Sequence, residues 1–200
     1  MNIGRITVGV LQANCYVVST KKSNAFIVDP GSDADKIKSY INKEKLKVAF
    51  IINTHFHFDH INANKELGYP VYIHRLDAEL IDAMPPKELP SFIMDEFKVN
   101  SFKPERLLED GDLIKLDELE LNILHTPGHS PGGISIKVDN VVFTGDTLFR
   151  DGIGRTDSPG GSYEQITESI NNKLLILGDE IIVYPGHGES TTIGRERANF

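Results

Sequence analysis

The sequence predicts a layered α/β domain, in which two β-sheets face each other and helices cover their outer sides. Two observations favour this class. Strand-like segments come first, then helices, then strands and helices again, an order that fits stacked layers better than a doubly wound parallel sheet. The 200 residues, 40% of them hydrophobic and 25% charged, also have the size and composition of one globular domain with a buried core.

The first elements are three short strands joined by turns. Residues 5–11, 14–19 and 24–28 are rich in residues that favour strands. Asp29-Pro30-Gly31 then closes the third strand, and we interpret Asp29 as a turn residue, with a hydrogen bond to a nearby histidine as the alternative. The chain therefore begins as a β-meander.

Helices and strands alternate in the next part of the chain. Residues 33–44 carry Ile37, Tyr40 and Ile41 at helical spacing behind a Ser-Asp start, and residues 48–52 read as a strand buried on both faces. The elements that follow are a helix at about 60–67 stopped by Gly68, a strand at 71–73, and a helix from 76 to about 83 before Pro85-Pro86. Segment 84–105 is predicted to wall a pocket, to form a subunit interface or to be a plain connecting helix.

The last third returns to strands. They are expected at 113–116, 119–124, 134–138 and 141–144, with Asp139-Asn140 as a tight hairpin turn. A Gly-rich loop at 145–161, a helix at 162–175 and a strand at 180–184 complete the prediction.

The densest group of chemically active residues follows the strand at 48–52. There, His55, His57, Asp59 and His60 put four metal-capable side chains into six residues. Because residues two apart on an extended chain point the same way, His55 and His57 can chelate one ion, while the turn into the next helix carries Asp59 and His60 elsewhere. The spacing indicates two adjacent ions.

Three further candidates stand where predicted strands or their loops end. His129, Asp146 and His187 each lie beside a glycine, which lets the backbone approach a compact site closely. Five histidines and two carboxylates can serve two ions if one carboxylate bridges them. Imidazole and carboxylate suit Zn²⁺, Fe²⁺ and Mn²⁺ alike, so the residues alone do not select the metal.

Composition excludes several other classes of function. A net charge of −8 without a basic stretch argues against nucleic-acid binding, so a small molecule is the expected partner. The longest apolar run is far too short to cross a bilayer, and the start of the chain does not resemble a signal peptide, so we expect no membrane association and a cytoplasmic location. Cys15 is the only cysteine and is expected to be a small buried residue, so any metal must be held by histidine and carboxylate.

These motifs resemble the metallo-β-lactamase superfamily and, within it, the short glyoxalase II-like hydrolases. The resemblance rests on residues 54–60, residues 126–133, Gly145-Asp146-Thr147-Leu148-Phe149 and Gly186-His187. It implies a four-layer αββα sandwich with the site at one edge of the sheets. It also implies a ligand set, in which His55, His57 and His129 hold the first metal, Asp59, His60 and His187 the second, and Asp146 bridges.

The resemblance further implies an activity. Glyoxalase II-like enzymes hydrolyse thioesters such as S-lactoylglutathione through a metal-bound hydroxide, and Asp59 would both ligate the second ion and orient that hydroxide. Two divalent ions are expected, zinc first, with iron or manganese as alternatives. Residues 1–200 are expected to form a single domain without the C-terminal helical domain that helps full-length glyoxalase II to bind glutathione.

Alternatives remain open at several positions. The loop at 152–157 also resembles persulfide dioxygenases, in which two histidines and one carboxylate hold a single Fe²⁺, and a lactone or ester hydrolase could use the same residues. A purely structural metal site is a further alternative, although such sites are usually Cys-rich. Arg155 could bind a substrate carboxylate, or pair with Asp157 or a nearby backbone carbonyl. His74 and His125 are expected to be surface or hydrogen-bonded residues, with support of a metal ligand as the alternative.

Overall fold

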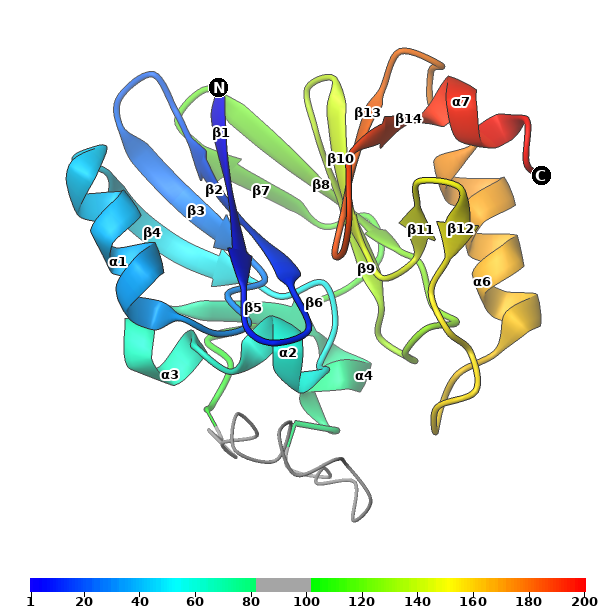
Figure 1. The fold of residues 1–200 in the computed structure, drawn as a ribbon, viewed down its shortest axis with the longest axis horizontal. Helices are drawn as coiled ribbons and strands as arrows, with labels where there is room; N and C mark the ends of the chain where they lie inside the picture. Colours follow the sequence, from blue (N-terminus) through cyan, green and yellow to red (C-terminus); the bar gives the residue numbers. More distant parts are fainter. Residues whose placement is uncertain (82–101) are drawn as a thin grey trace.

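The structure, a computed structural model, describes residues 1–81 and 102–200. Two six-stranded sheets lie face to face between helices, with α1 outside the first sheet and α6 outside the second (Figure 1). This arrangement confirms the predicted αββα sandwich. Within the described residues, no helix is long and apolar enough to cross a membrane.

The first sheet contains the N-terminal strands in sequence order. Its members are β1 (Asn2–Val8), β2 (Ala13–Ser19), β3 (Asn24–Val28), β4 (Lys47–Ile52), β5 (Val71–His74) and β6 (Arg106–Leu108). The pairs β1–β2 and β2–β3 are antiparallel, which confirms the predicted meander, and the pairs from β3 to β6 are parallel. Since β3 and β4 are parallel neighbours, their carboxyl ends lie at one edge of the sheet.

The second sheet has the order β14-β13-β10-β9-β8-β7. Its members are β7 (Leu113–Leu116), β8 (Leu119–His125), β9 (Ile134–Val138), β10 (Val141–Gly145), β13 (Ile182–Pro185) and β14 (Thr191–Thr192). The turn between β9 and β10 is formed by Asp139 and Asn140 as predicted, and Asp139 takes a left-handed φ of 47°. A separate hairpin joins β11 (Leu148–Phe149) to β12 (Gly152–Ile153).

Seven helical segments accompany the two sheets in the described residues. They are α1 (Ala34–Lys43), α2 (Phe58–Ile61), α3 (Asn64–Leu67), α4 (Arg75–Ala78), α6 (Tyr163–Ser169), the π-helix η1 (Ile170–Leu174) and α7 (Ile193–Arg197). Ile37 and Ile41 of α1 and Leu67 of α3 join the cluster over the first sheet. Ile166 of α6 and Ile170 and Leu174 of η1 join the cluster over the second.

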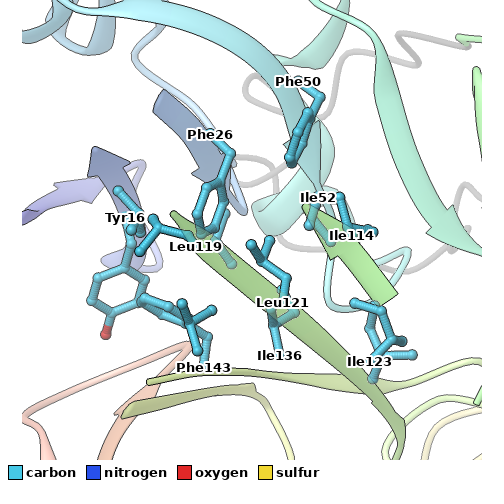
Figure 2. Close-up of a cluster of buried hydrophobic side chains, with 14 of the residues drawn as sticks. Tyr16, Phe26, Phe50, Ile52, Ile114, Leu119, Leu121, Ile123, Ile136 and Phe143 are labelled. Carbon is cyan, nitrogen blue, oxygen red and sulfur yellow. The ribbon is translucent and has the colours of Figure 1, made fainter. Parts of the chain in front are cut away.

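The main core lies between the two sheets and follows from the period of two along each strand (Figure 2). In β2, Tyr16 points into this core, while Cys15 and Val17 belong to the cluster under the helices. Leu119 and Leu121 of β8 enter the same core from the second sheet. The expectation that Cys15 is a small buried residue is confirmed.

Two predictions of local structure need correction, and two others fall partly outside the described residues. Strand β4 is not buried along its whole length, since Ala49 is exposed and Val48 is half-buried. Strand β5 pairs only with the last two residues of β4, so the start of β4 has no strand neighbour on that side. The helix expected at 60–67 is two short helices, α2 and α3. Most of segment 84–105, and the end of the helix expected at 76–83, lie outside the described residues.

Candidate metal centre

The seven candidate side chains lie at the carboxyl ends of strands from both sheets. His55 and His57 follow β4, Asp59 and His60 are in α2, His129 lies in the loop between β8 and β9, Asp146 follows β10, and His187 follows β13. Because β10 and β13 are parallel neighbours, Asp146 and His187 leave the second sheet at the same edge. Backbone hydrogen bonds join the two sheets there, from Asn14 N–H to Gly186 O and from Ile134 N–H to Thr54 O.

Three of the histidines form one group, which we call the histidine triad: His55, His57 and His129. One ring nitrogen from each lies within 4.8 Å of the others. The ring centroids are 4.7 Å apart for His55 and His57, 4.8 Å for His55 and His129, and 4.6 Å for His57 and His129. Residues 72 positions apart in the sequence thus meet at a single point.

Asp59, His60 and His187 form a second group, which we call the mixed triad. Nε2 of His187 lies 3.2 Å from Oδ2 of Asp59 and 3.3 Å from Nε2 of His60. Nε2 of His60 in turn lies 3.6 Å from Oδ2 of Asp59. These three ligand-capable atoms also lie within 4.8 Å of one another.

Asp146 lies between the two triads. Its Oδ2 is 3.6 Å from Nε2 of His129 in the histidine triad and 3.6 Å from Nε2 of His187 in the mixed triad. Its Oδ1 is 3.5 Å from Nε2 of His60. The structure therefore brings all seven predicted side chains together, with the carboxylate that was expected to bridge in the middle.

Two buried atoms of this centre have no hydrogen-bond partner among the described residues: Nε2 of His55 and Oδ1 of Asp146. An unsatisfied buried polar atom costs about 1–3 kcal/mol, so native proteins rarely keep two of them in one site. Cations held at the two triads would give each of these atoms a partner. The donor set of imidazole nitrogens and carboxylate oxygens is also the set that suits Zn²⁺, Fe²⁺ or Mn²⁺.

Hydrogen bonds on the far side of the rings decide which nitrogen faces the centre. Thr54 Oγ1–H donates to Asp29, so the 3.0 Å contact between Nδ1 of His55 and Thr54 Oγ1 must have His55 as the donor. Nδ1–H of His129 likewise donates to the backbone oxygen of Arg155, at 2.8 Å. In both rings the proton is held outside, and the lone pair of Nε2 points inward, as a metal ligand requires.

Asp29 performs the same task for His60. Its buried carboxylate accepts hydrogen bonds from Thr54 N–H at 2.7 Å and lies 3.0 Å from Nδ1 of His60. The interpretation of Asp29 as a turn residue alone is therefore wrong. It does take a left-handed φ of 52° at the end of β3, yet this conformation also turns its side chain toward His60.

Electrostatics divides the centre into a neutral half and a charged half. Burial lowers the pKa of His55 well below its ordinary value, and burial together with His129 lowers the pKa of His57 to about 3. Burial also opposes charge on His60, but the nearby carboxylates of Asp59, Asp146 and Asp29 outweigh it and raise its pKa to about 10. The histidine triad is therefore uncharged at neutral pH, with Nδ1 of His57 2.8 Å from Nε2 of His129, while a cation at the mixed triad would replace the proton of His60.

The remaining candidates lie outside this centre. The rings of His74 and His125 stack on each other with centroids 4.2 Å apart, and each ring also has a backbone hydrogen bond, to Leu76 N–H and to Pro131 O respectively. The exposed side chain of Arg155 pairs with Asp157 through two hydrogen bonds of 2.8 and 3.1 Å. The pairing with Asp157 was one of the expectations for Arg155, and the role of Arg155 toward substrate stays a prediction.

Comparison with known proteins places these features in one family. The family model described as the metallo-beta-lactamase superfamily matches residues 8–187. Hydroxyacylglutathione hydrolase GloC from Haemophilus influenzae is 38% identical over 205 residues, which cover 98% of this chain and 95% of that protein.

Two solved structures are similar over nearly the whole chain. BLEG-1 B3 metallo-beta-lactamase has a TM-score of 0.84 at 33% identity, covering 98% of this chain and 97% of its own. The di-iron-bound form of TTHA1623 has a TM-score of 0.77 at 34% identity, with 97% and 96% covered.

Proposed function

The chain belongs to the metallo-beta-lactamase superfamily, and on this premise we propose that it is a metal-dependent hydrolase that cleaves a thioester such as S-lactoylglutathione. One observation carries the proposal: seven histidine and aspartate side chains converge at one site, and two of their buried atoms have no hydrogen-bond partner among the described residues. A small-molecule substrate is consistent with the acidic charge of the chain.

We assign the side chains to two ions. The histidine triad would hold the first and the mixed triad the second, and Asp146, which lies between the triads, would serve both. Zinc is the expected metal, and iron or manganese fits the same donors. When bound, two such cations supply a hydroxide at neutral pH and stabilise the negative charge that develops on a carbonyl oxygen under attack.

Asp59 is the residue we expect to orient the attacking water. Its pKa is held below the ordinary value, against the effect of burial, by His60 and His187, so the carboxylate is ionised throughout the neutral range. An ionised carboxylate can accept the hydrogen bond of the water and hold its lone pair toward the thioester carbonyl. The departing thiolate is a stable anion and needs no strong acid, so the reaction makes no demand for a further proton donor.

The substrate class is suggested by two features. The relative from Haemophilus influenzae bears the name hydroxyacylglutathione hydrolase and matches nearly the whole chain. The guanidinium of Arg155 is exposed, and the backbone oxygen of the same residue holds His129. We infer that a glutathione carboxylate could displace Asp157 and bind the guanidinium of Arg155, a residue whose backbone contacts the histidine triad.

The test is turnover of S-lactoylglutathione by protein of measured metal content. Wild type with two equivalents of zinc should hydrolyse it, and Asp59→Ala should lose at least a hundredfold in kcat because the water is no longer oriented. Asp35→Asn, an exposed carboxylate on α1, is the matched control and should keep full activity. Lactone, simple ester and β-lactam substrates belong in the same series, and a strong preference for any of them would overturn the thioester assignment.

A second candidate is a mononuclear iron persulfide dioxygenase. The mixed triad of two histidines and one carboxylate has the composition that non-haem Fe²⁺ oxygenases use, which favours this alternative. Metal analysis combined with an oxygen electrode separates the two functions. One iron per chain with O₂ uptake on glutathione persulfide would replace the hydrolase proposal.

A further inference from the structure

Asp77 is a fully buried carboxylate outside the seven-residue centre, in the short helix α4. Three donors surround it. Its Oδ2 accepts hydrogen bonds from Phe56 N–H at 3.0 Å and from the hydroxyl of Ser130 at 2.7 Å, and its Oδ1 accepts one from Gly132 N–H. Three hydrogen bonds to one buried carboxylate are what an ionised acceptor needs in place of water.

The positions of these donors in the chain are informative. Phe56 stands between His55 and His57, and Ser130 directly follows His129. Asp77 therefore connects the two chain segments that supply the histidine triad, across 21 residues on one side and 53 on the other. A second connection between these segments is the backbone bond from Ile134 N–H to Thr54 O.

The loop at residue 132 packs closely against Asp77. A Cβ atom on residue 132 would come 2.6 Å from Oδ1 of Asp77 and 2.6 Å from the backbone nitrogen of Asp77, so the loop can reach the carboxylate only with glycine at this position.

The mixed triad is held by different contacts. Asp29 bonds the ring of His60, and Asn53 Nδ2–H donates to the backbone oxygen of His60.

We propose that Asp77 is a positioning residue that sets the geometry of the histidine triad and thereby its affinity for a cation, without touching the cation or the substrate. The proposal rests on the metal site assigned above. Metal ligands must be placed to within about 0.2 Å, and three hydrogen bonds to one rigid acceptor supply that precision for two segments at once. Loss of Asp77 should therefore weaken one of the two ions selectively.

The test is a Zn²⁺ titration of Asp77→Asn in competition with a chromogenic chelator. The amide has the size of the carboxylate but cannot accept from all three donors, since its NH₂ group would face one of them. We expect the affinity of one ion to fall about 10- to 100-fold, with the other unchanged. The absorption spectrum of Co²⁺ bound in place of that ion should change as well, a result that simple loss of stability would not produce.

Two further variants make the test specific. The first is His187→Ala, which removes a mixed-triad ligand, so that in this background the titration follows the histidine triad alone and shows which ion Asp77 serves. The second is the matched control Asp117→Asn, whose carboxylate also joins two turns by accepting hydrogen bonds from Thr20 Oγ1 at 2.7 Å and Asn24 Nδ2 at 2.8 Å. This control should leave both affinities at the wild-type value.

Clear outcomes would overturn the inference. Unchanged affinity in Asp77→Asn, or equal weakening of both ions, would show that Asp77 has no selective role. If Asp77→Asn does not fold, Ser130→Ala decides, because it removes one donor and should weaken the same ion about threefold; no change would again overturn the inference. A wild type that binds two ions but hydrolyses no thioester would contradict the proposed function and leave this inference intact.

Discussion

The carboxylate of Asp29 lies 3.0 Å from Nδ1 of His60, and both side chains are buried. These residues stand 31 positions apart, at the end of β3 and in α2. The contact fixes the ring so that its other nitrogen faces Asp59, Asp146 and His187. A partner that orients a ligand in this way commonly matters almost as much as the ligand itself.

Asp29→Asn should therefore weaken zinc binding at the mixed triad about 10- to 100-fold, because His60 loses its ionised acceptor. Competition titration with a zinc chelator measures the effect. Asp139→Asn is the matched control, since Asp139 also has a left-handed backbone but lies in an exposed hairpin turn. Equal affinities in the two variants would mean that Asp29 serves only the turn.

Gly186→Ala should disturb metal binding between the two triads, where Asp146 is expected to bridge the ions. A Cβ on residue 186 would come 2.2 Å from Oδ1 of Asp146 and 2.7 Å from Cε1 of His60, so one of these side chains must move. We expect at least a hundredfold loss of thioester turnover, with less than two metal ions bound per chain. Gly152→Ala, which meets nothing within 4 Å, should behave as wild type. Full metal content in Gly186→Ala would contradict the assignment of Asp146 as the bridge.

Chelation should lower the melting temperature. A ligand that binds only the folded state stabilises the protein by about 4 kcal/mol when its free concentration is a thousand times its Kd. For a chain of this length, that free energy corresponds to a rise in melting temperature of about 10 °C. The same shift should return when zinc is added back, as followed by calorimetry. Asp59→Ala should show a smaller shift because its second ion binds weakly. No change on chelation in the wild type would argue against a metal centre.

The pH dependence of stability should report on Asp77. Burial raises the pKa of Asp77 to about 6, although its three donors act in the opposite direction. Between about pH 4 and 6, the folded protein thus keeps a proton that the unfolded chain has released, so stability falls as the pH rises. The free energy of unfolding of wild type, relative to that of Asp77→Asn, should therefore fall by about 2 kcal/mol from pH 4 to pH 7. Urea unfolding of both metal-free proteins measures this, and parallel pH curves would refute it.

Arg155→Ala should separate the two roles of this residue. The backbone oxygen that holds His129 remains, so metal content should not change. The exposed pair with Asp157 contributes little to stability, so the melting temperature should not change either. If the guanidinium binds a carboxylate of the substrate, KM for S-lactoylglutathione should rise about tenfold with kcat preserved. An unchanged KM would remove Arg155 from the substrate site, and Arg150→Ala provides a comparison at another exposed arginine.

The order of strands and helices, and the positions of the seven candidate side chains at or near strand ends, could be predicted from the sequence alone. Hydrophobic periodicity and turn residues are local signals, so the meander, α1 and the Asp139-Asn140 hairpin were confirmed. The His-x-His-x-Asp-His motif is local as well, and its crowding is improbable without a chemical cause. Short elements such as β6 and the β11–β12 hairpin were missed, since two or three residues carry too weak a pattern.

Only the tertiary structure decided how the residues around the centre are held. Asp29 meets His60, and Asp77 meets the backbone of Phe56, because parallel pairing of β3, β4 and β5 brings the ends of these strands to one edge. The contacts of Arg155 with His129 and of Asp77 with Ser130 depend on how the loops of the second sheet fold back to that edge. A backbone carbonyl has no sequence signature, and a lone aspartate in a short helix looks like any surface residue. Side-chain type determines which atoms can bind a cation, whereas sheet pairing determines which of those atoms are close enough to share one.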